Sequence, residues 1–166
     1  MRLYLLRHAI ALPRGTPGVR DEDRPLTEKG RNRMEQEAVG IGHIVSTFDV
    51  ILTSPYKRAY ETAVITARVL GIAKNLKIFD PLKPGTSYDL LLNALKPYRN
   101  KEHIVLVGHE PDMSTIAATL ISMTEPAIDF KKGSLCCIEI DTIPPHAPGT
   151  LCWLLKPNHL RDLGSL

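Results

Sequence analysis

Short apolar runs alternate with longer amphipathic stretches along most of this chain. The apolar runs have the length of buried strands and lie at residues 3–6, 49–53, 76–79 and 103–107. Between them, apolar residues recur at helical spacing in residues 27–45, 55–70, 88–95 and 112–123. Strands that alternate with helices predict an α/β fold, a three-layer α/β/α sandwich with a mostly parallel central sheet. Two late runs, 134–140 and 151–155, predict an antiparallel pair at one edge of that sheet.

Residues with capping chemistry mark the start of two predicted helices. Thr27 is the predicted N-cap of the first helix. Ser54, with Pro55 behind it, is the predicted N-cap of the second. We expect Gly40 and Gly42 to weaken the far end of the first helix, because glycine disfavours the helical state by about 1 kcal/mol.

Length and composition fit one globular domain spanning residues 1–166. No apolar run approaches the roughly 20 residues of a membrane helix, and the first residues lack the features of a signal peptide. We therefore expect a cytoplasmic protein with no membrane association. The net charge of +3, without a basic run, argues against nucleic acid as a partner. Cys136, Cys137 and Cys152 have no ligand spacing, and we expect all three to be buried apolar residues.

Basic residues and histidines stand at the ends of three predicted strands. Arg7-His8 ends the first, Ser54 ends the second with Arg58 one helical turn further on, and Gly108-His109 ends another. In a parallel sheet these strand ends lie side by side, and ligands bind there. Helix N-termini at the same rim favour anions. The convergence predicts an anion site that contains a nucleophilic imidazole.

Four motifs in this order resemble the histidine phosphatase superfamily. They are Arg7-His8 after an N-terminal strand, Arg24-Pro25-Leu26-Thr27 before Gly30, Ser54-Pro55-Tyr56-Lys57-Arg58-Ala59 with Thr62, and Gly108-His109. Small size and motif order are similar to the short phosphohistidine phosphatase branch, the SixA type. The resemblance covers residues 1 to about 155 and implies a phosphoglycerate mutase-like fold without a large lid insertion.

The resemblance also implies roles for the residues at the strand ends. His8 is the expected nucleophile, and Arg7, Arg58 and His109 are expected to hold the phosphoryl oxygens. His8 must be neutral to attack phosphorus, and we expect nearby arginines to lower its pKa. Its other ring nitrogen should donate to a backbone carbonyl. Arginine and histidine supply the charge, so we expect no metal and no cofactor.

Three further residues are expected to bind substrate. Arg24 could bind phosphate, or it could pair with Asp21 or Asp23. Ser54 is expected to be a helix cap first and a site residue second. Glu110 directly follows His109 and could act as an acid or contact phosphate through its backbone.

The sequence departs from the family pattern at two places. Ala9 stands where many members have glycine, and residues 80–88 contain no glutamate that could protonate a leaving group as in the larger members. An alkoxide needs such a proton donor, whereas the imidazole of phosphohistidine leaves more easily. Glu110, Asp21 or Asp23 could still serve as the acid.

The expected activity is therefore a metal-independent phosphatase that removes phosphate from phosphohistidine in proteins. By resemblance, the substrate is a signalling protein such as a histidine phosphotransfer domain. One alternative is a phosphatase of small esters such as sugar phosphates. A second is a module that binds phosphate or phosphohistidine without turnover.

Overall fold

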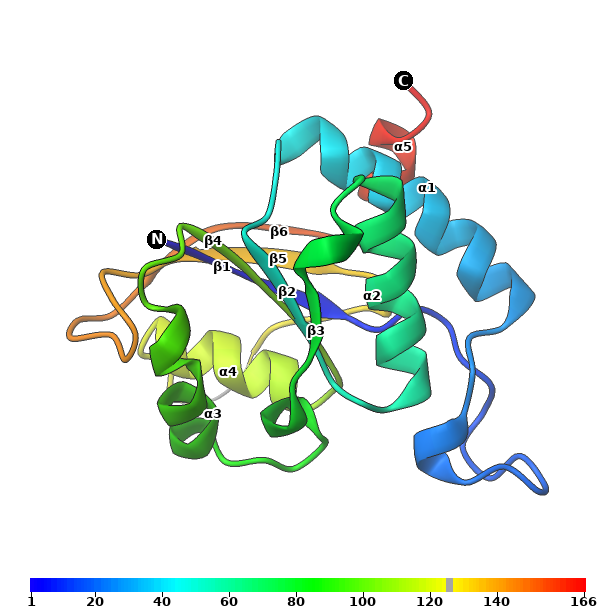
Figure 1. Cartoon of the computed structure of the whole chain (residues 1–166), viewed down its shortest axis with the longest axis horizontal. Coiled ribbons are helices and arrows are strands. Elements are labelled where there is room, and N and C mark those ends of the chain that lie inside the picture. Colours follow the sequence, from blue (N-terminus) through cyan, green and yellow to red (C-terminus); the bar gives the residue numbers. More distant parts are fainter. Residues whose placement is uncertain (125–126) are drawn as a thin grey trace.

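A computed structural model describes residues 1–124 and 127–166 of the chain and shows one six-stranded sheet (Figure 1). The strand order is β3-β2-β4-β1-β5-β6. The strands are β1 (Arg2–Arg7), β2 (Val50–Thr53), β3 (Leu76–Ile78), β4 (His103–Gly108), β5 (Leu135–Glu139) and β6 (Thr150–Leu155). The helices are α1 (Glu28–Ile44), α2 (Lys57–Val69), α3 (Tyr88–Leu95), α4 (Asp112–Leu120) and α5 (Pro157–Leu163).

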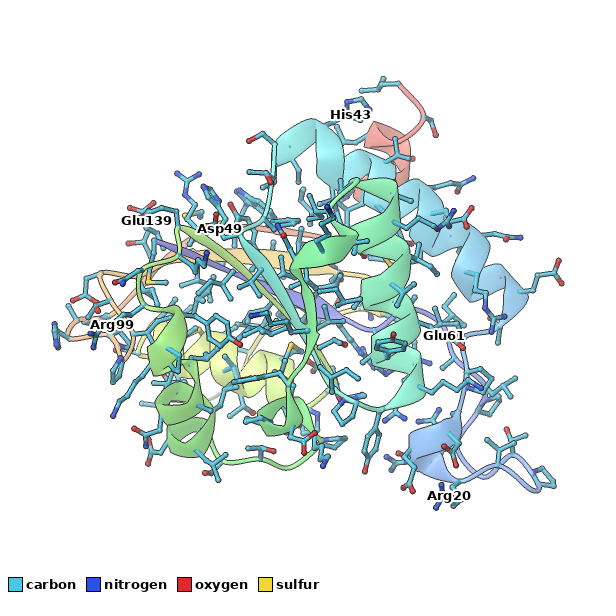
Figure 2. All side chains as sticks on the ribbon, viewed as in Figure 1. Arg20, His43, Asp49, Glu61, Arg99 and Glu139 are labelled. Carbon is cyan, nitrogen blue, oxygen red and sulfur yellow. The ribbon has the colours of Figure 1, made fainter. Side chains whose placement is uncertain are left out.

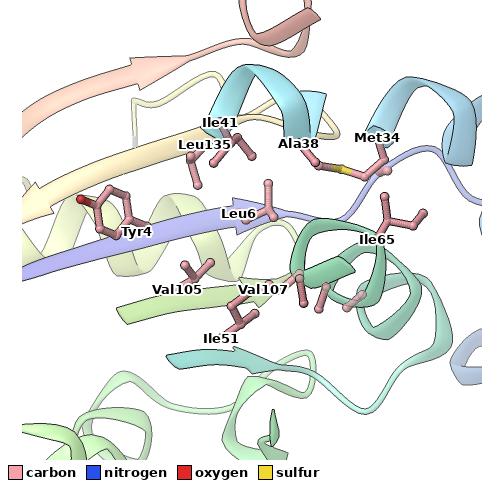
Figure 3. Packing of buried hydrophobic residues seen from close by; sticks show 14 of the residues in the cluster. Tyr4, Leu6, Met34, Ala38, Ile41, Ile51, Ile65, Val105, Val107 and Leu135 are labelled. Carbon is pink, nitrogen blue, oxygen red and sulfur yellow. The ribbon is translucent and has the colours of Figure 1, made fainter. Parts of the chain in front are cut away.

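Helices cover both faces of the sheet, which confirms the predicted three-layer α/β/α sandwich (Figure 1). Alternate side chains of β1 point to opposite faces, as in any strand. Tyr4 and Leu6 pack in the core under α1 and α2 (Figure 3). Leu3 and Leu5 pack in the second core under α3 and α4. Strands buried on both faces are continuously apolar, and this is the pattern of the short runs in the sequence.

The sheet is parallel except where β5 joins it. β1 runs parallel to β4, and β2 runs parallel to both β4 and β3. β5 pairs antiparallel with β1 and with β6. The predicted antiparallel pair at one edge is confirmed. Among the described residues, no helix is long and apolar enough to cross a membrane.

Both glycines lie within α1, and Gly40 has a packing role that helix propensity does not describe. The helix continues to Ile44, and a Cβ added at Gly40 would collide with the carbonyl oxygen of Leu160 in α5. Gly40 therefore permits α5 to pack closely against α1. The sequence pattern did not predict α5, which begins with Pro157 at its first position.

Thr27 is the N-cap of α1, as predicted, and its side chain accepts a hydrogen bond from the backbone of Gly30 at 3.0 Å. Three smaller expectations differ from the structure. Ser54 is not the cap of α2, however, because that helix begins later, with Tyr56 at the N-cap position. α4 ends at Leu120 rather than at residue 123. Two of the three cysteines are buried, but Cys152 is exposed on β6.

Candidate active site

The ends of three parallel strands lie side by side. Arg7 is the register partner of Gly108, and the backbone N–H of His8 donates to the Gly108 carbonyl at 3.0 Å. The N–H of Ser54 donates to the Val107 carbonyl at 3.0 Å. These bonds continue the sheet one residue past each strand. The structure therefore brings the two predicted histidine positions and Ser54 to one edge.

The ring of His8 is held in a single tautomer. Its Nδ1 lies 2.7 Å from the carbonyl oxygen of Ala9, and its Nε2 lies 3.3 Å from Nε of Arg58. An arginine only donates, so Nε2 accepts and Nδ1 carries the proton. The backbone of Ala9 is itself fixed, because its N–H donates to Oγ1 of Thr62 at 3.0 Å. His8 thus has a lone pair on Nε2 beside a guanidinium group.

Burial keeps His8 neutral. Loss of solvent, with smaller contributions from the charges of neighbouring Arg58 and Arg7, lowers the pKa of His8 to about 2, although the hydrogen bond to the Ala9 carbonyl opposes the shift. The arginines therefore act in the expected direction, but burial has the larger effect on this pKa. A neutral imidazole is the form that attacks phosphorus.

His109 faces His8 across a short gap. The two ring centroids are 5.2 Å apart, and Nε2 of His109 lies 2.9 Å from Oγ of Ser54. The ring of Tyr56 packs edge-on against His109 at 5.4 Å. Burial, with a contribution from Arg58, lowers the pKa of His109 to about 3. His109 is therefore neutral in the free protein and has one N–H to donate.

Two arginines are anchored so that part of each guanidinium stays near the histidines. Nη1 of Arg7 donates to the carbonyl of Phe130 at 2.5 Å. Nη1 of Arg58 donates to the carbonyl of Asp21 at 2.7 Å, and its Nη2 lies 3.3 Å from the carboxylate of the same residue. The Arg58 guanidinium also lies over the ring of Tyr56, 5.1 Å from the ring centroid. Both guanidinium groups are fixed before any substrate arrives.

Buried polar atoms without a hydrogen-bond partner gather at this edge. In the part of the chain that the structure describes, Nε of Arg7 and Nδ1 of His109 are two of the three buried side-chain N or O atoms left without one. Leaving a buried donor unsatisfied costs about 1–3 kcal/mol. An oxyanion bound here would accept from both groups. This pair of unpaired polar atoms is independent support for an anion site.

Arg24 pairs with an aspartate rather than lying free for substrate. Its Nε donates to Oδ1 of Asp21 at 2.9 Å, and its Nη1 donates to the carbonyl of Leu12 at 2.6 Å. Asp21 also contacts Arg14 and Arg58. Burial raises the pKa of the Asp21 carboxyl, but the arginines outweigh it and hold this pKa below its usual range. A carboxylate so held is a poor proton donor, and Asp23 is paired with Arg20.

Glu110 is occupied by the start of α4. Its carboxylate accepts from the backbone N–H of Ser114 at 3.0 Å and from the Ser114 hydroxyl. These contacts satisfy orphan donors of the first helical turn. The side chain of Glu110 therefore caps the N-terminus of α4.

The loop between β1 and α1, called the first loop below, is fixed against α2 by Glu61, a residue to which the sequence pattern gave no role. Glu61 accepts a hydrogen bond from the backbone of Leu26 at 2.8 Å. Figure 2 shows Glu61 on α2 and Arg20 on the loop after β1, whereas Asp49 and Glu139 lie at the opposite end of the sheet. The sequence pattern also gave no role to Tyr56, which packs against His109 and under the Arg58 guanidinium. Its position directly after Ser54-Pro55, at the end of a predicted strand, could have indicated a residue that lines the site.

A hollow of about 410 Å³ adjoins the histidines through Tyr56. Its wall carries charges of both signs and belongs to the first loop, the start of α2 and the segment before α3. The lining residues are Glu22, Asp23, Pro55, Tyr56, Lys57 and Lys83. The site thus opens onto a polar, accessible surface.

Fold and site geometry together define a class: an α/β protein in which two neutral histidines and two anchored arginines lie at one edge of a mostly parallel sheet. A model of the histidine phosphatase superfamily (branch 1) matches residues 3–82, which carry three of the four motifs. The chain belongs to the histidine phosphatase superfamily. Membership and site geometry support a phosphatase activity.

Relatives cover almost the whole chain. An uncharacterised protein of Picosynechococcus is 33% identical over 165 residues, covering 96% of this chain and 99% of the relative. The phosphohistidine phosphatase SixA of Escherichia coli is 22% identical over 163 residues, covering 97% of each chain.

Solved structures share the fold at lower identity. The protein histidine phosphatase SixA complexed with tungstate superposes with a TM-score of 0.83 at 23% identity, covering 96% of this chain and 99% of the other. A phosphoserine phosphatase of Entamoeba histolytica, with phosphoserine bound, gives a TM-score of 0.68 at 20% identity and covers 96% and 98%. The phosphoglycerate mutase-like fold expected from the sequence is therefore confirmed, while these relatives act on different phosphate compounds.

Proposed function

We propose that this protein is a phosphohistidine phosphatase that dephosphorylates a signalling protein through a covalent phospho-His8 intermediate. The observation that supports it most directly is the state of His8. Its Nδ1 donates to the Ala9 carbonyl, and its Nε2 lone pair lies beside Arg58 in a ring that burial keeps neutral. This is the arrangement that a nitrogen nucleophile toward phosphorus requires.

The proposed reaction has two displacements at phosphorus. In the first, Nε2 of His8 forms a bond to phosphorus while the bond to the substrate imidazole breaks, and the electron pair leaves with that imidazole. In the second, water attacks the phosphorus on His8 and loses a proton to the medium. The bond between phosphorus and Nε2 breaks, its electron pair returns to Nε2, and inorganic phosphate is released. Arg7, Arg58 and His109 stabilise the charge on the equatorial oxygens in both steps.

The contacts of the nearby carboxylates favour an imidazole over an alkoxide as the leaving group. Glu110 caps α4, and the pKa of Asp21 is held low by arginines. Neither is placed to protonate an alkoxide, which is a poor leaving group without an acid. An imidazole that already carries a proton on its other ring nitrogen leaves without such help. The accessible surface around Tyr56 also suits a protein-sized substrate.

The first test is hydrolysis of a phosphohistidine peptide in EDTA by the wild type, His8→Ala and His43→Ala. His43 is an exposed histidine near the end of α1 (Figure 2) and serves as the control. We expect turnover in the wild type and in the control, and a loss of at least about a thousandfold in His8→Ala. Trapping of phosphate on His8 in the denatured wild type would identify the intermediate. Equal rates in all three proteins would contradict the proposal.

A phosphatase of small esters is the second candidate, because fold relatives include a phosphoserine phosphatase and an α-ribazole phosphatase. The ratio of kcat/KM for a phosphohistidine peptide to that for phosphoserine or a sugar phosphate separates the two. Better turnover of the esters would favour the second candidate. Phosphate binding without turnover of either class would favour a binding module.

A further inference from the structure

The loop between α4 and β5 is fastened to Arg7. The backbone N–H of Arg7 donates to the Ser134 carbonyl at 3.1 Å, and the N–H of Gly133 donates to the Arg7 carbonyl at 3.1 Å. The Arg7 guanidinium adds its bond to the carbonyl of Phe130. Three hydrogen bonds therefore place Lys132, which lies between these anchors, beside the phosphoryl-binding arginine.

A tight turn also holds the backbone at Lys132. The N–H of Ser134 donates to the Lys131 carbonyl at 2.9 Å, which closes a turn. Gly133 has a φ of +86°, and a Cβ there would collide with the carboxylate of buried Glu37. These contacts hold the backbone from which the side chain of Lys132 begins.

Adjacent lysines of this loop have different environments. Lys131 forms an ion pair with Asp129 at 3.0 Å, and Lys156 binds the same carboxylate at 2.9 Å. Lys132 forms no ion pair and no side-chain hydrogen bond with any residue between 1 and 124 or between 127 and 166. An unpaired ammonium next to an anion site is available to an anionic ligand.

The ammonium of Lys132 is close enough to the site to be affected by its charges. The pKa of Lys132 is lowered by partial burial and then by three guanidinium groups, which belong to Arg7, Arg24 and Arg58. These guanidinium charges repel the ammonium of Lys132, although Asp21 partly offsets the charges of Arg24 and Arg58. A bound phosphoryl dianion would turn this repulsion into attraction.

We propose that Lys132 binds a non-reacting oxygen of the phosphoryl group at the mouth of the site and thereby increases its affinity for doubly charged phosphate. This inference rests on the proposed function only in placing a phosphoryl group next to Arg7. Lysine suits the task because it acts as a flexible point charge, whereas the arginines fix orientation with planar groups.

The test compares Lys132→Gln with the matched neighbour Lys131→Gln, using inorganic phosphate as the ligand in isothermal titration calorimetry. We expect Lys132→Gln to weaken phosphate binding about tenfold, as for the loss of one charged hydrogen bond. Lys131→Gln should bind as the wild type does, and Lys132→Arg should retain most of the affinity. Lys132 is exposed, so thermal melting should show that each variant is folded.

Salt separates direct contact from a general effect of positive charge. At 0.5 M salt the Debye length is about 4 Å, so a long-range effect would vanish while the difference between the two glutamine variants persists for a direct contact. Wild-type affinity in Lys132→Gln, or equal losses in both variants, would overturn the inference. Phosphate binding is measured without turnover, so a failure here leaves the proposed phosphatase intact. Conversely, a phosphohistidine peptide that is never hydrolysed would leave this result standing.

Discussion

At the scale of single residues, Ser54 shows where sequence patterns stop being informative. Serine before proline is typical of a helix N-cap, and that pattern predicted a capping role. The helix instead begins at Lys57, and the hydroxyl of Ser54 contacts His109. Spacing along the chain predicted that Ser54 stands at a strand end. It could not predict the direction of Oγ, because that direction depends on a strand distant in sequence.

We expect Ser54→Ala to lower kcat/KM about tenfold, because His109 loses the hydrogen bond that orients its ring, an interaction of about 1.4 kcal/mol. Ser134→Ala is the matched control. Both hydroxyls are fully buried, but Oγ of Ser134 has no partner among the described residues. Steady-state kinetics on a phosphohistidine peptide checks the pair. Equal activity of the two variants would mean that Ser54 does not position His109.

For the other site residues, too, the sequence predicted which residues take part but not all of their contacts. The identities of Arg7, His8, Arg58 and His109 followed from strand ends and motif order. The network around Asp21 did not, because a cluster of alternating charges in a loop permits many pairings. The structure selects one, in which Asp21 holds Arg24 and Arg58 together.

At the scale of elements, the contact between α1 and α5 depends on glycines at the crossing. A Cβ at Gly40 would collide with the Leu160 carbonyl, and one at Gly164 would collide with the Gln36 carbonyl. The two helices therefore approach backbone to backbone. Periodicity located α1 well because its buried face is long, whereas α5 is short and was missed. Helix propensity did not indicate the packing role of Gly40, because propensity describes an isolated helix and not one packed against another.

We expect Gly40→Ala to destabilise the protein by about 2 kcal/mol, since the added methyl group forces the two backbones apart. Gly42→Ala is the control in the same helix. Its Cβ would lie 3.1 Å from Cδ2 of Leu70, a flexible side chain that can move, so the better helix propensity of alanine should leave stability unchanged or raise it by up to about 1 kcal/mol. Chemical denaturation measures both. A Gly40→Ala variant as stable as Gly42→Ala would show that the close packing has no energetic consequence.

At the scale of the whole molecule, two neutral histidines are buried at one edge of the sheet. His8 and His109 have pKa values of about 2 and 3, compared with 6.5 for an exposed histidine. The folded state excludes protons that the unfolded chain takes up below pH 6.5. Stability from these two groups is therefore fully present above that pH and is lost as the pH falls toward their folded pKa values.

One buried carboxyl acts in the opposite direction. Burial raises the pKa of Glu37 to about 7, although its partner Arg161 lies 2.6 Å away and opposes the shift. A raised carboxyl pKa makes the folded state gain protons first, so this group adds stability as the pH falls from about 7 toward 4.5. The wild-type stability curve alone would thus mix opposite contributions.

A difference between two proteins isolates the histidines. We expect the free energy of unfolding of the wild type, minus that of His8→Asn/His109→Asn, to fall by about 3 kcal/mol between pH 7.5 and pH 5.5. Each histidine contributes about 1.4 kcal/mol one pH unit below its unfolded pKa. Glu37 is present in both proteins and cancels in the difference. Urea denaturation at the two pH values measures the effect. Parallel stability curves would show that His8 and His109 titrate in the folded protein as they do in the unfolded chain. Burial would then not keep the proposed nucleophile neutral below pH 6.5.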